Sequence, residues 1–312
     1  MKIAVFGAGG VGAYYGGRLA QAGHDVAFIA RGTHLAAMRT GGLRVDSIAG
    51  DFVIEPVNAT DAPAEVGAVD AVLVAVKAWQ VEECAQAMKP MLGSHTLVVP
   101  LQNGIDAPEV LAAALGDTCV LGGACGISAF IVGPGHVSHV AVDPYIQFGA
   151  RDDAANPMIE KLHAAFAQAK GVSAEISDDI QATMWQKFLG VAPIGAVGAI
   201  TRAPIGVMVA DPQINAMLES AKHEIWAVGK VLGVNWAAAA IERVTAVHGS
   251  VPFGTTASMA RDILEGRPSE LDGQVGAIVR LGAELGVPTP VNRFVLDCLL
   301  PQERRARGEL EF

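Results

Sequence analysis

Short apolar runs separated by polar stretches occupy the first half of the chain. Runs of this length that are rich in Val, Ile and Ala are typical of parallel strands buried on both faces of a sheet. We predict strands at residues 2–6, 24–30, 70–76, 96–100, 120–131, 135–148 and 172–176, and a β-hairpin region at 42–57. Residues 11–22 and 157–170 have the apolar spacing of amphipathic helices, so this half is predicted to be α/β.

The second half follows the helical period from about residue 177. The polar residues 177–179 are N-cap candidates for a helix that runs through Trp185 and beyond. Further helices are predicted at residues 212–232, 236–247, 258–265 and 274–285. The change of pattern predicts an α/β domain at 1–178 and an all-helical domain at 179–312.

A glycine-rich turn follows the first predicted strand. Gly7, Gly9 and Gly12 fit G-x-G-x-x-G between a strand and a helix, which is the context of a dinucleotide-binding turn. Gly7 permits the tight turn, Gly9 lets the backbone approach a pyrophosphate, and Gly12 lets the helix lie close to the strand. The helix N-terminus adds unpaired N–H groups that suit an anion. The same glycines could form only a turn, but the flanking strand and helix favour dinucleotide binding.

This motif predicts a Rossmann-type doubly wound sheet for the α/β domain, with the helical domain after it. We expect the cofactor to contact the residues of the turn, which are Gly7, Ala8, Gly9, Gly10, Val11 and Gly12.

The residue after the second predicted strand bears on the identity of the cofactor. NAD-binding forms of this fold carry an acidic residue near the end of this strand, where it holds the ribose 2′-hydroxyl. Here that position is Arg31, and Asp25 lies at the opposite end of the strand. A guanidinium can hold a 2′-phosphate with two hydrogen bonds, whereas a carboxylate repels it. We therefore predict NADP(H) rather than NAD(H); the alternative is that Arg31 is a solvated surface residue.

Two further polar residues follow predicted strands. Lys77 comes after the strand at 70–76, and Asn103 follows the strand at 96–100. Ligands of open α/β sheets bind beyond the carboxyl ends of the strands, so Arg31, Lys77 and Asn103 could line one crevice. A lysine or asparagine in this position can also be merely solvated or part of a turn.

Composition limits the classes of partner. The 312 residues are 51% hydrophobic and carry a net charge of −10, which argues against nucleic acid or an anionic membrane as a general partner. The four cysteines form no C-x-x-C pair, so we expect no metal site and a reducing compartment. The glycine motif occupies the N-terminal apolar run, and residues 188–200 are too short to span a bilayer, so we expect a soluble cytoplasmic protein. The apolar helical half could supply a homodimer surface.

Candidate chemistry lies in the helical half. Lys187 stands in an otherwise apolar helix, where it either extends its charge to solvent or is partly desolvated, as suits a proton donor. Spacing alone does not decide between the two. Ser258 and Asp262 are four residues apart and share a helical face. Glu270 precedes the next helix, where it could also be a first-turn acid facing the helix dipole.

A series of motifs in this order resembles the ketopantoate reductase (2-dehydropantoate 2-reductase) family over nearly the whole chain. The resemblance implies NADPH-dependent reduction of a 2-oxo acid in a cleft between a Rossmann domain and a helical domain. The matching motifs are G-A-G-G-V-G at 7–12, A-R-G at 30–32, V-K-A at 76–78, L-Q-N-G at 101–104, W-Q-K at 185–187, S-M-x-x-D at 258–262 and S-E-L-D-G at 269–273.

The resemblance also implies roles for individual residues. Lys187 would be the general acid that protonates the developing alkoxide. Glu270 would lie near this lysine, the cofactor and the substrate. Ser258 would hold a polar group of the substrate, and Asn103 would help to place the substrate and the nicotinamide. Arg31 and Lys77 would lie at the 2′-phosphate end of the cofactor and on the cofactor side of the cleft.

One departure from the family bears on the substrate. The family usually has asparagines four and eight residues after this lysine, where this chain has Val191 and Gly195. A lost hydrogen bond to a buried polar group is worth roughly 1–3 kcal/mol. The leading hypothesis is reduction of 2-dehydropantoate to pantoate in pantothenate biosynthesis. The alternatives are a related NADP-dependent dehydrogenase for a bulkier or more apolar 2-oxo or hydroxy acid, and a non-catalytic NADP(H)-binding sensor.

Overall fold

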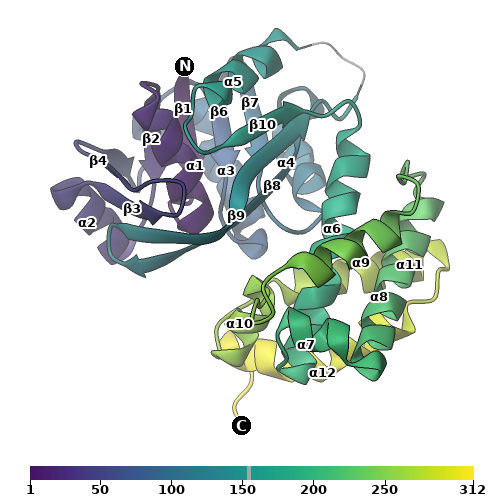
Figure 1. Ribbon diagram of the computed structural model, residues 1–312. Coiled ribbons are helices and arrows are strands. Elements are labelled where there is room, and N and C mark those ends of the chain that lie inside the picture. The colour runs from purple at the N-terminus through teal and green to yellow at the C-terminus, as the bar shows by residue number, and fades with distance from the viewer. Residues whose placement is uncertain (153–155) are drawn as a thin grey trace. The chain divides into compact units, whose positions relative to one another are not determined.

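The chain divides into two units, each with its own type of architecture (Figure 1). The first unit contains residues 1–102 and 107–180, and the second contains residues 103–106 and 181–312. This computed structural model describes residues 1–152 and 156–312. The first unit is α/β and the second is helical, which confirms the predicted fold class.

A five-stranded parallel sheet forms the centre of the first unit, in the order β5-β2-β1-β6-β7. This is the Rossmann order, in which the chain starts at the middle strand and winds outward on both sides. Its strands are β1 (Lys2–Phe6), β2 (Asp25–Ile29), β5 (Asn58–Thr60), β6 (Val69–Val74) and β7 (Leu92–Pro100). The helices that follow its strands are α1 (Gly10–Gln21), α2 (Gly32–Gly41), α3 (Val81–Met88) and α4 (Ala107–Leu115).

The inner strands β1, β2 and β6 are apolar on both faces because helices cover both faces of the sheet. Ile3 and Val5 of β1 pack with α1, whereas Ala4 and Phe6 pack with α3 and α4. This two-sided burial explains why β1, β2, β6 and β7 could be found from their apolar runs, whereas the short edge strand β5, which has the sequence N-A-T, was not predicted.

A second sheet belongs to the same unit and has the order β10-β9-β3-β4, with β8 paired to β9. Its strands are β3 (Leu43–Ser47), β4 (Phe52–Ile54), β8 (Gly122–Gly133), β9 (His136–Gly149) and β10 (Ser173–Ile176), and α5 spans Pro157–Ala167. The predicted hairpin is confirmed as the antiparallel pair β3–β4, and β10 is an edge strand as expected. The Tyr15 hydroxyl of α1 donates to the carbonyls of Gly126 in β8 (3.1 Å) and Tyr145 in β9 (2.6 Å), which attaches this sheet to α1.

The second unit is organised around one long helix, α6, which contributes to three apolar clusters of that unit. Trp185 and Phe188 lie in the first cluster, Ala196 in the second and Val197 in the third. Its helices are α6 (Ile180–Thr201), α7 (Ile205–Ala210), α8 (Pro212–Val231), α9 (Ala240–Ser250), α10 (Ser258–Leu264), α11 (Ala277–Leu285) and α12 (Pro290–Ala306), with a π-helical turn at Asp272–Gly276.

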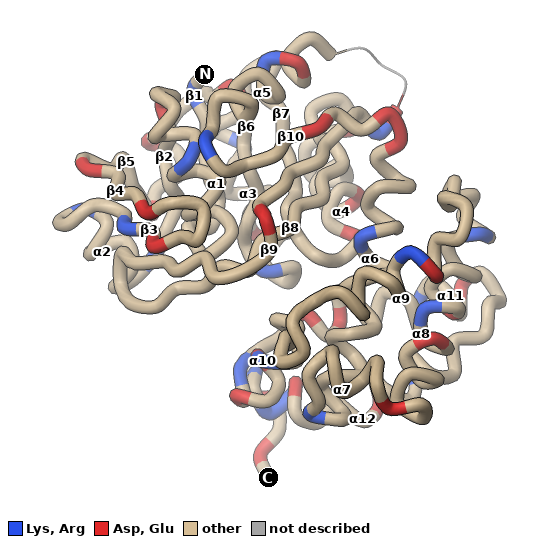
Figure 2. Tube along the Cα trace, viewed as in Figure 1, with Lys and Arg blue, Asp and Glu red and all other residues tan. Residues whose placement is uncertain are grey.

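The sequence did not predict α7 or α12, and α9 begins four residues later than expected. A buried carboxylate fixes the start of α12: Glu224 of α8 accepts hydrogen bonds from the backbone N–H of Val291 (2.7 Å) and of Asn292 (2.9 Å). Acidic and basic residues are interspersed along both units (Figure 2). Within the described residues, no helix is long and apolar enough to cross a membrane.

Candidate active site

The glycine turn connects β1 to α1 at the carboxyl edge of the parallel sheet. Gly7 has a φ of +97°, and a Cβ there would lie 2.9 Å from the backbone nitrogen of Val76. A Cβ at Gly12 would overlap the Gly7 carbonyl oxygen, and one at Gly10 would overlap the Ala129 carbonyl oxygen of β8. Gly7, Gly10 and Gly12 are therefore required by the packing of the turn itself.

Gly9 differs from its neighbours because a Cβ there would meet no described atom within 4 Å. Gly9 is also the N-cap of α1, and no side chain of the described residues caps this helix. The first turn of α1, which is described in full, contains no acidic residue. The open space at Gly9 and the uncapped N–H groups fit the pyrophosphate of a dinucleotide.

Arg31 and Lys77 follow β2 and β6, the two strands on either side of β1. The Arg31 side chain is 63% exposed, and its Nη2 pairs with a carboxylate oxygen of Glu83 at 2.8 Å. The Lys77 Nζ lies 5.9 Å from the centre of the Trp79 ring. Three neighbouring strands of the sheet are thus followed by the predicted features: β2 by Arg31, β1 by the glycine turn and β6 by Lys77. The pairing with Glu83 of α3 was not predicted, because a helical acid gives no local signal of it.

Asn103 groups with the helical unit, although it directly follows the strand region of the first unit. Gly104 packs on the segment after Glu270, since a Cβ at Gly104 would lie 2.6 Å from the Gly273 carbonyl oxygen. Ile105 is buried in the same apolar cluster as Trp185 and Phe188. The structure therefore brings the Asn103 loop to the segments that carry Glu270 and Lys187.

Lys187 is the single charged residue of α6, whose other residues are apolar or neutral. Its side chain is half-buried, and its neighbours Trp185 and Phe188 are buried. Lys187, Val191 and Gly195 are spaced by four residues and therefore share one face of the helix.

Gly195 lies close to two segments that carry predicted site residues. A Cβ at Gly195 would lie 2.9 Å from Cε of Met259, which follows Ser258 in α10. The same Cβ would lie 3.7 Å from Oε1 of Gln274. Asp262, on the same helix as Ser258, pairs with Arg267 at 2.8 Å.

Helix α12 holds the segment that precedes Glu270. The Ser269 backbone N–H donates to both carboxylate oxygens of Glu303 at 3.1 Å, and the Ser269 hydroxyl donates to one of them at 2.5 Å. Nη2 of Arg307 donates to the Ser269 carbonyl at 3.2 Å. Glu270 itself is 7% exposed, and its Oε2 accepts a hydrogen bond from Nε2 of Gln274 at 3.4 Å. Gln274 was not predicted as a site residue, although its spacing of four from Glu270 was a signal available in the sequence.

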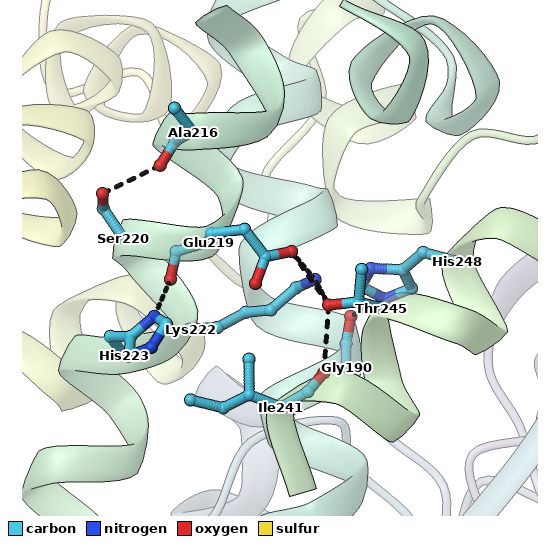
Figure 3. Close-up of polar contacts among 9 residues, drawn as sticks. All are labelled: Gly190, Ala216, Glu219, Ser220, Lys222, His223, Ile241, Thr245 and His248. Carbon is cyan, nitrogen blue, oxygen red and sulfur yellow. Dashed lines mark hydrogen bonds and ion pairs between the residues drawn. The ribbon is translucent and has the colours of Figure 1, made fainter. Parts of the chain in front are cut away.

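A second polar cluster lies between α8 and α9, within the same unit (Figure 3). Nζ of Lys222 donates to Glu219 and to Thr245, both at 2.8 Å, and the Lys222 side chain is fully buried. Nε2 of His248 bonds the Gly190 carbonyl of α6 at 2.9 Å. Burial lowers the pKa of Lys222, and burial together with the Lys222 charge lowers the pKa of His248 to about 4. Burial opposes ionisation of Glu219, but the hydrogen bonds from Lys222 and Thr245 outweigh it and lower the pKa of that carboxyl.

Two family models match the chain, one on each part. Residues 3–153 match the model described as ketopantoate reductase PanE/ApbA, and residues 179–303 match the one described as ketopantoate reductase PanE/ApbA C terminal. A curated 2-dehydropantoate 2-reductase of Mesorhizobium japonicum is 30% identical over 99% of this chain and 98% of the relative.

Solved structures show the same fold. The crystal structure of a PanE/ApbA family ketopantoate reductase from Ralstonia eutropha JMP134 has a TM-score of 0.89 and 33% identity, and covers 98% of this chain and 100% of that chain. The ternary structure of D-mandelate dehydrogenase with NADH and anilino(oxo)acetate also has a TM-score of 0.89, with the same coverage. Its 23% identity shows a shared fold only.

Proposed function

The chain belongs to the ketopantoate reductase family, and on that premise we propose that it reduces 2-dehydropantoate to pantoate with NADPH. The first unit binds the cofactor in this proposal, and the second unit carries the groups that bind and protonate the substrate. The observation that carries it is the convergence, within the helical unit, of the segments bearing Asn103, Lys187, Ser258 and Glu270.

In this proposal Lys187 stabilises the negative charge that develops on the substrate and donates a proton to it. When bound, NADPH supplies the hydride that the keto carbon of the substrate accepts. Negative charge then develops on the substrate oxygen, and an ammonium beside it stabilises that charge and donates a proton. Lys187 is suited to this role because it is the charged residue of an otherwise neutral helix and its side chain is half-buried.

The proposed contacts with the cofactor lie at the carboxyl edge of the parallel sheet. The N–H groups at Gly9 and the start of α1 would hold the pyrophosphate. Arg31 would bind the 2′-phosphate, because only one of its nitrogens is engaged by Glu83 and its side chain is largely exposed. Lys77 would lie on the same side of the bound cofactor as Arg31.

Consumption of NADPH by the purified protein with 2-dehydropantoate tests the proposal, with NADH in parallel. We expect faster turnover with NADPH, and we expect Lys187→Ala to lower kcat by about 10²–10⁴-fold while the Kd for NADPH stays unchanged. Lys230→Ala, which removes an exposed lysine of α8, is the matched control and should keep full activity. Normal turnover by Lys187→Ala would refute the role given to Lys187.

A second candidate substrate is a bulkier or more apolar 2-oxo acid. The observation that favours it is the face of α6 beyond Lys187, where Val191 is apolar and Gly195 has no side chain. Higher kcat/KM for an aromatic or branched 2-oxo acid than for 2-dehydropantoate would support this candidate.

A further inference from the structure

Gln274 presents a buried hydrogen-bond acceptor to which no described residue donates. Its side chain lies in the π-helical turn after Glu270 and is 1% exposed. Its Nε2 donates to Glu270, whereas its Oε1 has no hydrogen-bond partner among the described residues. A buried amide oxygen without a donor is costly, and native proteins rarely leave one unless another molecule supplies the donor.

The orientation of this amide is fixed by the Glu270 carboxylate. The carboxylate accepts a hydrogen bond only from the NH2 end of the amide, so the oxygen points away from Glu270. The unpaired oxygen is therefore a consequence of the neighbouring acid.

The surroundings of Oε1 are apolar and adaptable. The position that a Gly195 side chain would occupy lies 3.7 Å from Oε1, and the flexible end of Met259 lies beside it. A methionine side chain can adopt other rotamers at low cost, so a small group can be admitted here. The group must bring its own hydrogen, because a keto or carboxylate oxygen cannot satisfy an amide oxygen.

We propose that Oε1 of Gln274 accepts a hydrogen bond from a hydroxyl group of the substrate, and that the enzyme therefore selects 2-oxo acids that carry a hydroxyl near the keto group. This inference rests on the proposed function, which places the substrate beside Glu270, the hydrogen-bond partner of Gln274. A substrate without the hydroxyl leaves Oε1 unpaired in the complex, and sites of this kind discriminate strongly against such analogues.

The test compares 2-dehydropantoate with 3,3-dimethyl-2-oxobutanoate, which has the same carbon skeleton and lacks only the hydroxyl. We expect the wild-type protein to prefer the hydroxylated substrate by at least about 10²-fold in kcat/KM. Gln274→Met has a similar length but lacks the amide oxygen. It should reduce this preference to less than about tenfold, mainly through KM for the hydroxylated substrate. Because this variant also loses the hydrogen bond to Glu270, the ratio of the two kcat/KM values carries the test rather than either rate alone, and thermal unfolding checks that the variant is folded.

Gln213→Met, at an exposed position of α8, is the matched control and should keep the full preference. If Gln274→Met does not fold, Gln274→Asn serves instead, because it withdraws the amide by one methylene and should also reduce the preference. Equal use of both substrates by the wild type, or an unchanged preference in the Gln274 variants, would overturn this inference and leave the proposed function standing. Absence of turnover with every 2-oxo acid would overturn both.

Discussion

The glycines of the first turn serve two different purposes. Gly7, Gly10 and Gly12 each face backbone atoms so closely that a Cβ would force the turn apart. Gly9 faces open space, so the protein alone does not require glycine there. The missing side chain at Gly9 is explained by a ligand that approaches the backbone.

Gly9→Ala should separate ligand binding from folding. Its φ of −72° suits alanine, so we expect the free energy of unfolding to change by less than about 1 kcal/mol. The Kd for NADPH should rise at least about tenfold, because the new methyl group occupies the approach to the pyrophosphate. Thermal unfolding and a fluorescence titration with NADPH measure the two effects. Gly41→Ala, at the exposed end of α2, is the control and should leave the Kd unchanged; tight binding by Gly9→Ala would argue against the site.

At the scale of elements, α9 supports α6 next to its internal proline. Pro193 has no N–H, so α6 lacks one of its backbone hydrogen bonds. The neighbouring carbonyl of Gly190 accepts a hydrogen bond from His248 of α9 (Figure 3). His248 is 4% exposed and faces the Lys222 ammonium, with Glu219 beyond it, so the folded protein holds it neutral.

This arrangement predicts a loss of stability in mild acid. The pKa of His248 is about 4 in the folded protein and about 6.5 in the unfolded chain, so the unfolded chain binds the proton more tightly. Stability from this residue is intact above pH 6.5 and falls as the pH drops toward 4, by up to about 3 kcal/mol. Urea unfolding at a series of pH values between 7.5 and 4.5 measures this change in the free energy of unfolding. His248→Gln, which keeps an N–H for Gly190, should flatten this dependence, and equal slopes for both proteins would contradict the assignment.

Elements buried on both faces were predictable, and elements defined by tertiary packing were not. Strands β1 and β6 each contain an uninterrupted apolar run, at residues 3–6 and 71–74, so their sequence alone identifies them. The separate sheet of β8 and β9 depends on contacts with α1, such as those of Tyr15, which lie far away in sequence. The motifs indicated Lys187 and Glu270 as candidates. The unpaired oxygen of Gln274 could not be predicted, because it depends on how the folded chain places the amide against the Glu270 carboxylate and beside Gly195 and Met259.

For the whole molecule, the division into units does not follow the order of the chain. Residues 103–106 leave the first unit and join the second before the chain returns to α4. Ile105 is 8% exposed and packs with Trp185, Phe188 and other core residues of the helical unit. Residues from the middle of the α/β half therefore stabilise the helical half.

Ile105→Ala should destabilise the helical unit by about 2–3 kcal/mol, because it removes a buried side chain and leaves a cavity. Tryptophan fluorescence during urea unfolding is a suitable probe, since most of the tryptophans lie in this unit, namely Trp185, Trp226 and Trp236. Ile131→Ala, a 47% exposed position on β8, should cost less than about 0.5 kcal/mol. A similar small effect for Ile105→Ala would show that the loop adds little to the core.

The excursion of residues 103–106 also restricts how the helical half can be exchanged between relatives. A recombination with a single crossover near residue 180 would transfer residues 181–312 and leave Gly104 and Ile105 behind. Those two residues from one parent would then have to fit Gly273 and Trp185 from the other. Viable chimaeras should therefore inherit the loop and the helical half from the same parent, as a linked pair of segments.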